Sequence, residues 1–128
     1  MGKPQNTSKI REVINNISDI KVETAIQEKP LGIANALESA SQFLDDEIIV
    51  VNPNDVFEGS VYSILLEAGK DKQATAYLPG YEVSDYFPGG YLVVGKGGEL
   101  VNIVEKPERG KEPSNLVNIL IHLHTDPK

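Results

Sequence analysis

The chain has 128 residues, 40% of them hydrophobic and 24% charged, which is typical of one small globular domain. Its net charge of −7 argues against a protein that binds the nucleic-acid backbone, because such a protein needs a basic face. The longest apolar run, Ile48–Val51, is too short to span a membrane. The chain has no cysteine and residues 1–8 are polar, without an apolar signal segment, so we expect a cytoplasmic protein.

Helix and strand patterns alternate in the first half of the chain. Apolar residues three and four positions apart predict a helix over residues 8–17, with Ser8 as its N-cap. Alternating apolar and polar residues predict a strand over Ile20–Ile26, and a second helix is expected over residues 33–44. The continuously apolar Ile48–Val51 is typical of a strand buried in a parallel sheet.

The second half is richer in strand patterns. A helix is expected over Val61–Ala68, with Gly69 as its C-cap. Four strands are expected, the second and third forming a hairpin: Ala74–Leu78, Tyr91–Val94, Leu100–Val104 and Leu116–Leu123. The order of elements predicts an α/β sheet with helices on its faces and a β-hairpin insertion, formed by one domain over residues 1–128.

Two loops follow predicted strands at places where α/β proteins bind ligands. In Gln27–Gly32 a glycine allows a flat ring to approach the backbone; the alternative is an ordinary strand-to-helix turn. In Asn52–Asp55 a carboxylate is placed to hold Mg²⁺ against substrate phosphates, whereas Asn-Pro and Asn-Asp also favour a plain Asx turn.

Two further groups carry polar chemistry near the end of the chain. In Glu105–Pro107 the lysine can bind a phosphate and the glutamate can accept hydrogen bonds from sugar hydroxyls, although Glu-Lys is common on protein surfaces. His122 and His124 are expected on the same face of a strand, where a metal would need a third ligand that the sequence does not show.

Four segments resemble motifs of the sugar-1-phosphate nucleotidyltransferases, in the order of that family. Ile26–Leu37 is similar to the pattern Gln-x-x-Pro-Leu-Gly-Thr-Ala-x-Ala-Leu, and Ile48–Phe57 resembles a strand with a Gly-Asp turn. Gly98–Pro107 resembles Gly-x-Val-x-x-Phe-x-Glu-Lys-Pro, and Ser114–Asn118 is similar to Ser-Asn-Leu-Ala-Asn. The resemblance extends from about residue 8 to residue 125.

This resemblance implies a Rossmann-like nucleotide-diphospho-sugar transferase sheet and a reaction of a nucleoside triphosphate with a sugar 1-phosphate. The products would be a nucleotide sugar and pyrophosphate, with Mg²⁺ as cofactor. By motif position the resemblance implies three sets of site residues: Gln27, Pro30, Leu31 and Gly32 for the base; Gly90, Glu105, Lys106 and Asn118 for the sugar and its phosphate; and Asn54 or Asp55 for the metal.

The sequence also departs from the family pattern. The glycine-rich triphosphate loop of the family has no counterpart before Gln27, and the second metal carboxylate would lie beyond Lys128. Gly89 replaces a usual tyrosine, and Leu120 adds bulk where the family leaves room for the sugar. We therefore expect a truncated, inactive form whose domain is incomplete at its N-terminal side.

Two alternatives remain beside this interpretation: a non-catalytic module that binds nucleotide sugars, or a structural subunit completed by a partner chain. In the family the glycine-rich loop follows a strand in the middle of the sheet, and this chain lacks that strand too. Its absence would leave the edges of Ile20–Ile26 and Ile48–Val51 open, so we also expect a homo-oligomer.

Overall fold

The computed structural model describes residues 7–17 and 20–126, and the chain forms two compact units, Met1–Asp45 and Asp46–Lys128. The first unit contains helix α1 (Thr7–Ile14), helix α2 (Ile33–Ser39) and the 3₁₀ turn η2 (Ser41–Phe43). The second unit contains one helix and seven strands among its described residues. The two units are described separately below.

Helix α1 has the predicted apolar spacing but different ends. It already includes Thr7, so Ser8 lies inside the helix and the prediction of Ser8 as N-cap is wrong. It ends at Ile14, and turns follow in which the backbone N–H of Ile17 donates to the carbonyl of Ile14. Asn15 and Asn16 favour this ending, because asparagine is a weak helix former that bonds the backbone; the Asn16 amide donates to the carbonyl of Glu12.

The prediction of a strand over Ile20–Ile26 is wrong. The segment has no ladder partner among the described residues, and only Ile26 forms an isolated bridge. Alternation of apolar and polar residues favours a strand, but a strand is stable only where a neighbouring strand accepts its hydrogen bonds.

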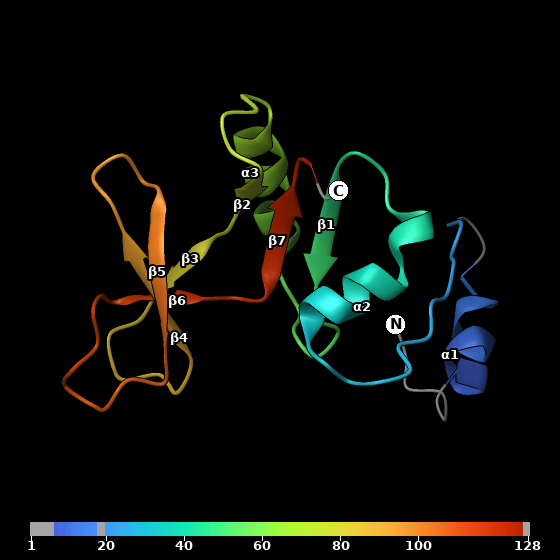
Figure 1. Cartoon of the computed structure of the whole chain (residues 1–128), viewed down its shortest axis with the longest axis horizontal. Helices are drawn as coiled ribbons and strands as arrows, with labels where there is room; N and C mark the ends of the chain where they lie inside the picture. Colours follow the sequence, from blue (N-terminus) through green and yellow to red (C-terminus); the bar gives the residue numbers. More distant parts are fainter. Residues whose placement is uncertain (1–6, 18–19, 127–128) are drawn as a thin grey trace. The chain divides into compact units, whose positions relative to one another are not determined.

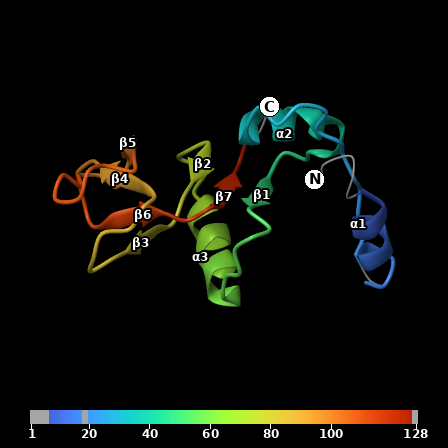
Figure 2. The ribbon, with the colours of Figure 1, turned by 90° about the horizontal axis from the view of Figure 1, so that it is seen from below.

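Three strands and helix α3 (Gly59–Gly69) form the first half of the second unit. The strand order is β1 (Ile48–Val51), β7 (Ile121–His124), β2 (Ala76–Tyr77), and both pairings are antiparallel. Figure 2 shows α3 beside these strands. Its buried Leu65 belongs to a core cluster with the fully buried Ile121 and Leu123.

Strand β1 exists where predicted, but its expected parallel environment is wrong. Its one ladder partner among the described residues is the antiparallel β7, which places β1 at an edge of the sheet. Its side chains are accordingly half-buried, and that of Val51 is exposed. A run of four apolar residues predicts a strand but cannot identify its neighbour.

Helix α3 ends at Gly69, but the prediction of Gly69 as its C-cap is wrong. Lys70 is the C-cap residue, and Gly69 has a right-handed backbone. A Cβ atom at position 69 would lie 2.4 Å from Cδ2 of Leu123. Glycine is therefore needed at position 69 because the helix end approaches the central strand closely.

The second sheet has four antiparallel strands in the order β3 (Gly80–Glu82), β6 (Leu116–Asn118), β4 (Gly90–Val94), β5 (Leu100–Glu105). The predicted hairpin of β4 and β5 is confirmed, while β3 was not predicted. Tyr91, Leu92 and Val117 are its most buried side chains, each at most 3% exposed.

The predicted single strand Leu116–Leu123 is divided between the two sheets. Its first part is β6, its last part is β7, and Figure 1 shows the chain passing from one sheet to the other between them. The α/β fold class is confirmed, with antiparallel pairing throughout the described strands. No described helix is both long enough and apolar enough to cross a membrane.

Candidate functional site

Four residues form one row across the four-stranded sheet. Gly80 pairs with Asn118, and Gly90 pairs with Glu105. Because Tyr91 pairs with Val117 in the antiparallel pair of β4 and β6, the next step of the register places Gly90 opposite Asn118. Residues directly opposite one another share a face of the sheet. We name Gly80, Asn118, Gly90 and Glu105 the cross-strand row.

Gly90 makes room for the carboxylate of Glu105. A Cβ atom at position 90 would lie 2.8 Å from Oε1 of Glu105 and 3.0 Å from Cγ2 of Ile103. Real Cβ atoms do not approach so closely, so any other residue at position 90 would displace the carboxylate. The structure thus brings together three of the residues predicted to bind the sugar, namely Gly90, Glu105 and Asn118.

Lys106 directly follows the row and turns the chain away from the sheet. Its backbone is left-handed, with φ of 43°, which is uncommon for a residue other than glycine and costs about 1–2 kcal/mol. Its N–H donates to the carbonyl of Gly89 at 3.0 Å, which holds this turn beside Gly90. The Lys106 side chain is exposed, so a cation stands next to the carboxylate end of the row.

The turn after β1 is attached to the place where the chain changes sheets. The N–H of Asn52 donates to the carbonyl of Leu120 at 2.9 Å. Within the turn, Oδ1 of Asn52 accepts from the N–H of Asn54, and its carbonyl accepts from the N–H of Asp55. This is the Asx turn that the sequence offered as an alternative, and it leaves the side chains of Asn54 and Asp55 exposed.

The residues expected to contact a base lie in the first unit. Gln27 closes this loop: its Nε2 donates to the carbonyl of Gly32 at 3.1 Å and to Oδ1 of Asn35 at 2.9 Å. Gly32 has φ of 102° and ψ of −178°, a conformation reserved for glycine. Pro30 and Leu31 are exposed at the tip of the loop. The motif therefore forms a fixed turn at the start of α2.

His122 and His124 lie on the same face of β7, as predicted, with ring centroids 6.3 Å apart. His122 also contacts the cross-strand row, because its Nε2 lies 3.0 Å from Oδ1 of Asn118. Burial, and secondly the neighbouring His124, lower the pKa of His122 below its usual value. Among the described residues, no group of three histidine, aspartate or glutamate side chains is placed to hold a metal ion.

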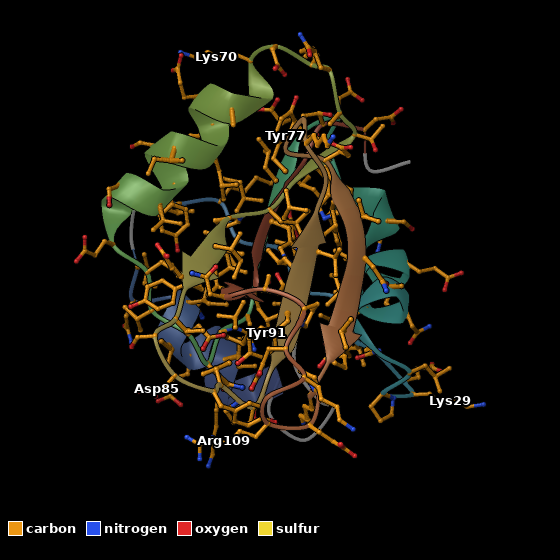
Figure 3. The ribbon with its side chains drawn as sticks, turned by 90° about the vertical axis from the view of Figure 1, so that its left-hand side faces the viewer. Lys29, Lys70, Tyr77, Asp85, Tyr91 and Arg109 are labelled. Atoms are coloured by element: carbon orange, nitrogen blue, oxygen red, sulfur yellow. The ribbon has the colours of Figure 1, made fainter. Side chains whose placement is uncertain are left out.

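A polar cavity that the sequence did not indicate lies at one end of the four-stranded sheet. It has a volume of about 340 Å³, and its lining includes Asp85, Tyr91, Arg109 and Glu112. Figure 3 shows Asp85, Tyr91 and Arg109 near one end of this sheet. The N–H of Gly110 bonds both carboxylate oxygens of Glu112 and thereby lowers the pKa of that group. The cavity residues come from two loops and strand β4, so no local motif marks them.

Comparison with known proteins identifies the family of this chain. The nucleotidyl transferase family matches residues 2–124. The bifunctional protein GlmU of Methanococcus maripaludis strain C7 is 31% identical over 102 residues, which cover 80% of this chain and 23% of that protein. GlmU of strain C5 of the same species has the same identity and coverage. The chain therefore spans about a quarter of the length of these curated relatives.

Solved structures show the same fold. The apo form of a UDP-glucose pyrophosphorylase matches with a TM-score of 0.71 at 18% identity, over 94% of this chain and 48% of that one. UDP-glucose pyrophosphorylase from Acinetobacter baumanii matches with a TM-score of 0.69 at 24% identity, over 93% and 48%. The family match extends over nearly the whole sequence, and the chain belongs to the nucleotidyl transferase family.

Proposed function

We propose that this chain supplies the sugar-phosphate-binding part of a sugar-1-phosphate nucleotidyltransferase. The observation that carries the proposal is the cross-strand row with Lys106 at its end. Gly90 leaves room for the Glu105 carboxylate to lie over its strand, next to the strand that carries Asn118, so a hydrogen-bond donor and an acceptor stand side by side on one face of the sheet. The Glu105 carboxylate accepts hydrogen bonds from sugar hydroxyls, and the ammonium group of Lys106 neutralises the phosphate.

In the proposed reaction an oxygen of the sugar phosphate attacks the α-phosphorus of a nucleoside triphosphate. A new P–O bond forms as the bond to pyrophosphate breaks, giving a nucleotide sugar and pyrophosphate. The chain's residues contribute by positioning and by charge: Glu105 fixes the sugar, and Lys106 offsets the negative charge of its phosphate. Such positioning and neutralisation account for most of the catalysis in phosphoryl-group chemistry.

We propose Mg²⁺ as the metal, with Asp55 or Asn54 as its ligand. Mg²⁺ is commonly held by one or two carboxylates together with substrate phosphates, so one exposed carboxylate in an ordered turn fits the ion when phosphates complete its shell. The bound ion would neutralise phosphate charge. The amide oxygen of Asn52 already accepts the backbone N–H of Asn54. Asp55 is the carboxylate of this turn and therefore offers its charged oxygens.

We assign the base of the nucleotide to the Gln27–Gly32 turn. The turn is held by the Gln27 amide, and the absence of a side chain at Gly32 lets a planar ring approach the backbone. Gln27, Pro30, Leu31 and Gly32 would form this base site. The ligand of this base site would be a nucleoside triphosphate or a nucleotide sugar.

A binding measurement tests the role of Lys106. Titration of the chain with a sugar 1-phosphate is expected to lose about 10- to 150-fold in affinity in Lys106→Ala, since one charge-assisted contact is removed. Lys111→Ala is the matched control, because Lys111 is an exposed lysine of the following loop that pairs with Glu108. Equal affinity of wild type and Lys106→Ala would refute this assignment.

Turnover is a separate measurement. Gly2 is the only glycine before Gly32, so these 128 residues contain no glycine-rich loop ahead of Gln27 to bind the leaving pyrophosphate. The polypeptide tested by itself is expected to bind sugar phosphate with negligible turnover, because each lost donor to a developing anion commonly costs about 10²-fold or more. Pyrophosphate release at about 1–10³ per second would contradict this expectation.

We further propose a cytoplasmic homo-oligomer that forms at the edge of β1. The outer backbone groups of this strand face away from β7, and the exposed Val51 adds apolar surface to the edge. Such an edge favours pairing with a second copy. Sedimentation velocity at micromolar concentration tests the proposal, and Val51→Pro should shift an oligomer toward monomer, because the register of β1 and β7 turns the N–H of Val51 away from β7. A single 14.0 kDa species in the wild type would refute it.

A further inference from the structure

The amide of Asn118 is held by a neighbour from the other sheet. Asn118 ends β6, and His122 lies on β7, after the chain has changed sheets. The 3.0 Å contact joins Nε2 of His122 to Oδ1 of Asn118. A carbonyl oxygen can only accept a hydrogen bond, so this contact is a hydrogen bond in the tautomer whose Nε2 carries the proton. The contact therefore fixes both the tautomer of the imidazole and the orientation of the amide.

The surroundings of His122 hold its ring in place. β7 is the central strand of its sheet, and His122 pairs with Val50 of β1. Its chain neighbours Ile121 and Leu123 are both fully buried, which anchors the backbone on either side. The ring itself is half-buried. A side chain anchored in this way has little freedom to follow a ligand, so it can orient Asn118 before a ligand arrives.

The hydrogen bond decides which group Asn118 presents on the row. Its Oδ1 is occupied by His122, which leaves the two N–H groups of Nδ2 as donors. On the other side of Gly90, Glu105 presents a carboxylate that only accepts. The Glu105 carboxylate reaches over Gly90, where its Oε1 lies 2.8 Å from the position of a Cβ atom. The acceptor therefore lies one strand spacing, roughly 4.8 Å, from the strand that carries the Asn118 donor.

We propose that His122 is a positioning residue that fixes the Asn118 amide so that its N–H groups face the sugar. The inference rests on the proposed function, because it assigns the cross-strand row to a sugar. The row then recognises a ligand by two complementary contacts. One hydroxyl accepts a hydrogen bond from Asn118, and another donates a hydrogen bond to Glu105.

Two substitutions separate positioning from packing. His122→Phe keeps a flat ring but removes the donor, whereas His122→Gln keeps an amide N–H within reach of Asn118. His124→Phe is the matched control, since His124 lies on the same face of the same strand. Loss of one neutral hydrogen bond predicts about a 2- to 12-fold weaker binding of sugar 1-phosphate in His122→Phe, with recovery in His122→Gln. Equal affinities in wild type, His122→Phe and His122→Gln would overturn the proposal.

Nitrogen NMR of the chain without ligand gives an independent result. The ¹⁵N shifts of His122 should show the Nε2–H tautomer, and the side-chain amide signals of Asn118 should move in His122→Phe but not in His124→Phe. An Nδ1–H tautomer, or Asn118 signals unchanged in His122→Phe, would overturn the proposal. If the wild type binds no sugar 1-phosphate, the proposed function fails, and these signals still decide whether His122 positions Asn118. If His122→Phe does not fold, His122→Gln and the wild-type tautomer decide it.

Discussion

The Gln27–Gly32 turn and the cross-strand row are both candidate binding surfaces, but they are built differently. The turn is closed by hydrogen bonds to groups five and eight residues away, at Gly32 and Asn35. The row is assembled from four strands whose order in the sheet is not their order in the chain. A local motif can therefore specify the first surface, whereas the second depends on the register of a whole sheet.

This difference predicts how each surface responds to damage. Substitutions in the sheet core should disturb all residues of the row together, because the register of one sheet aligns all of them. Substitutions in the turn should have effects confined to the start of α2. The predictions below test this contrast, from the largest expected effect to the smallest.

Tyr91→Ala should have the largest effect. The Tyr91 side chain is 1% exposed, its ring stacks on Tyr86, and its hydroxyl accepts from the N–H of Phe87 at 2.7 Å. Removing a buried aromatic ring typically lowers the free energy of unfolding by about 3–5 kcal/mol. Urea unfolding measures the change, and Tyr81→Ala is the control because Tyr81 is 61% exposed on the same sheet. Equal losses in both variants would show that the sheet core lies elsewhere.

Gly32→Ala should have a smaller, local effect. Space for a Cβ atom is open at this position, so the cost comes from the backbone, where φ of 102° strains any other residue by about 1–3 kcal/mol. Hydrogen exchange should become faster at the N–H of Ala36, which bonds the carbonyl of Gly32, and stay unchanged in β4. The control is Gly59→Ala, which also meets open space but lacks a positive φ. Faster exchange in β4 would contradict the contrast between the two surfaces.

The smallest effect is expected from pH. Burial, and secondly His124, hold the pKa of His122 below its usual 6.5, so the folded chain binds a proton there less readily than the unfolded chain. The free energy of unfolding should therefore be highest above pH 6.5 and fall as the pH drops through this value toward the lower pKa of the folded state. Urea midpoints at about pH 7.5 and about pH 5.5 measure the slope. His122→Gln should show a shallower slope, and an unchanged slope would assign the effect to other groups.

Local chemistry let the sequence predict several features correctly. The helix α3 follows from its apolar spacing, and the β4–β5 hairpin follows from two apolar strand segments on either side of the Gly95–Gly98 turn. In that turn Gly98 has φ of 87°, which only glycine adopts readily. The motif order also predicted the family, which the match over residues 2–124 confirms. Each of these depends on residues close together in the chain.

The sequence-based predictions failed where a neighbour had to be identified. The apolar run Leu116–Leu123 reads as one strand, yet its two halves serve different sheets, and Ile20–Ile26 has a strand pattern without a ladder. Gly69 stands where a C-cap glycine is expected, but a small residue is needed there because the Leu123 side chain packs against it. Periodicity reports which face of an element is apolar and contains no information about what covers that face.

The candidate site shows the same division. The sequence by itself determined the chemistry of the residues: a carboxylate at Glu105, an ammonium at Lys106, an amide at Asn118 and glycine at Gly90. Tertiary structure alone decided that Gly80 joins this set and that His122 contacts Asn118. The physical reason is that strand register and the change of sheet after Asn118 depend on packing across the whole second unit. Residue type sets what a group can bind, and the register sets which groups bind together.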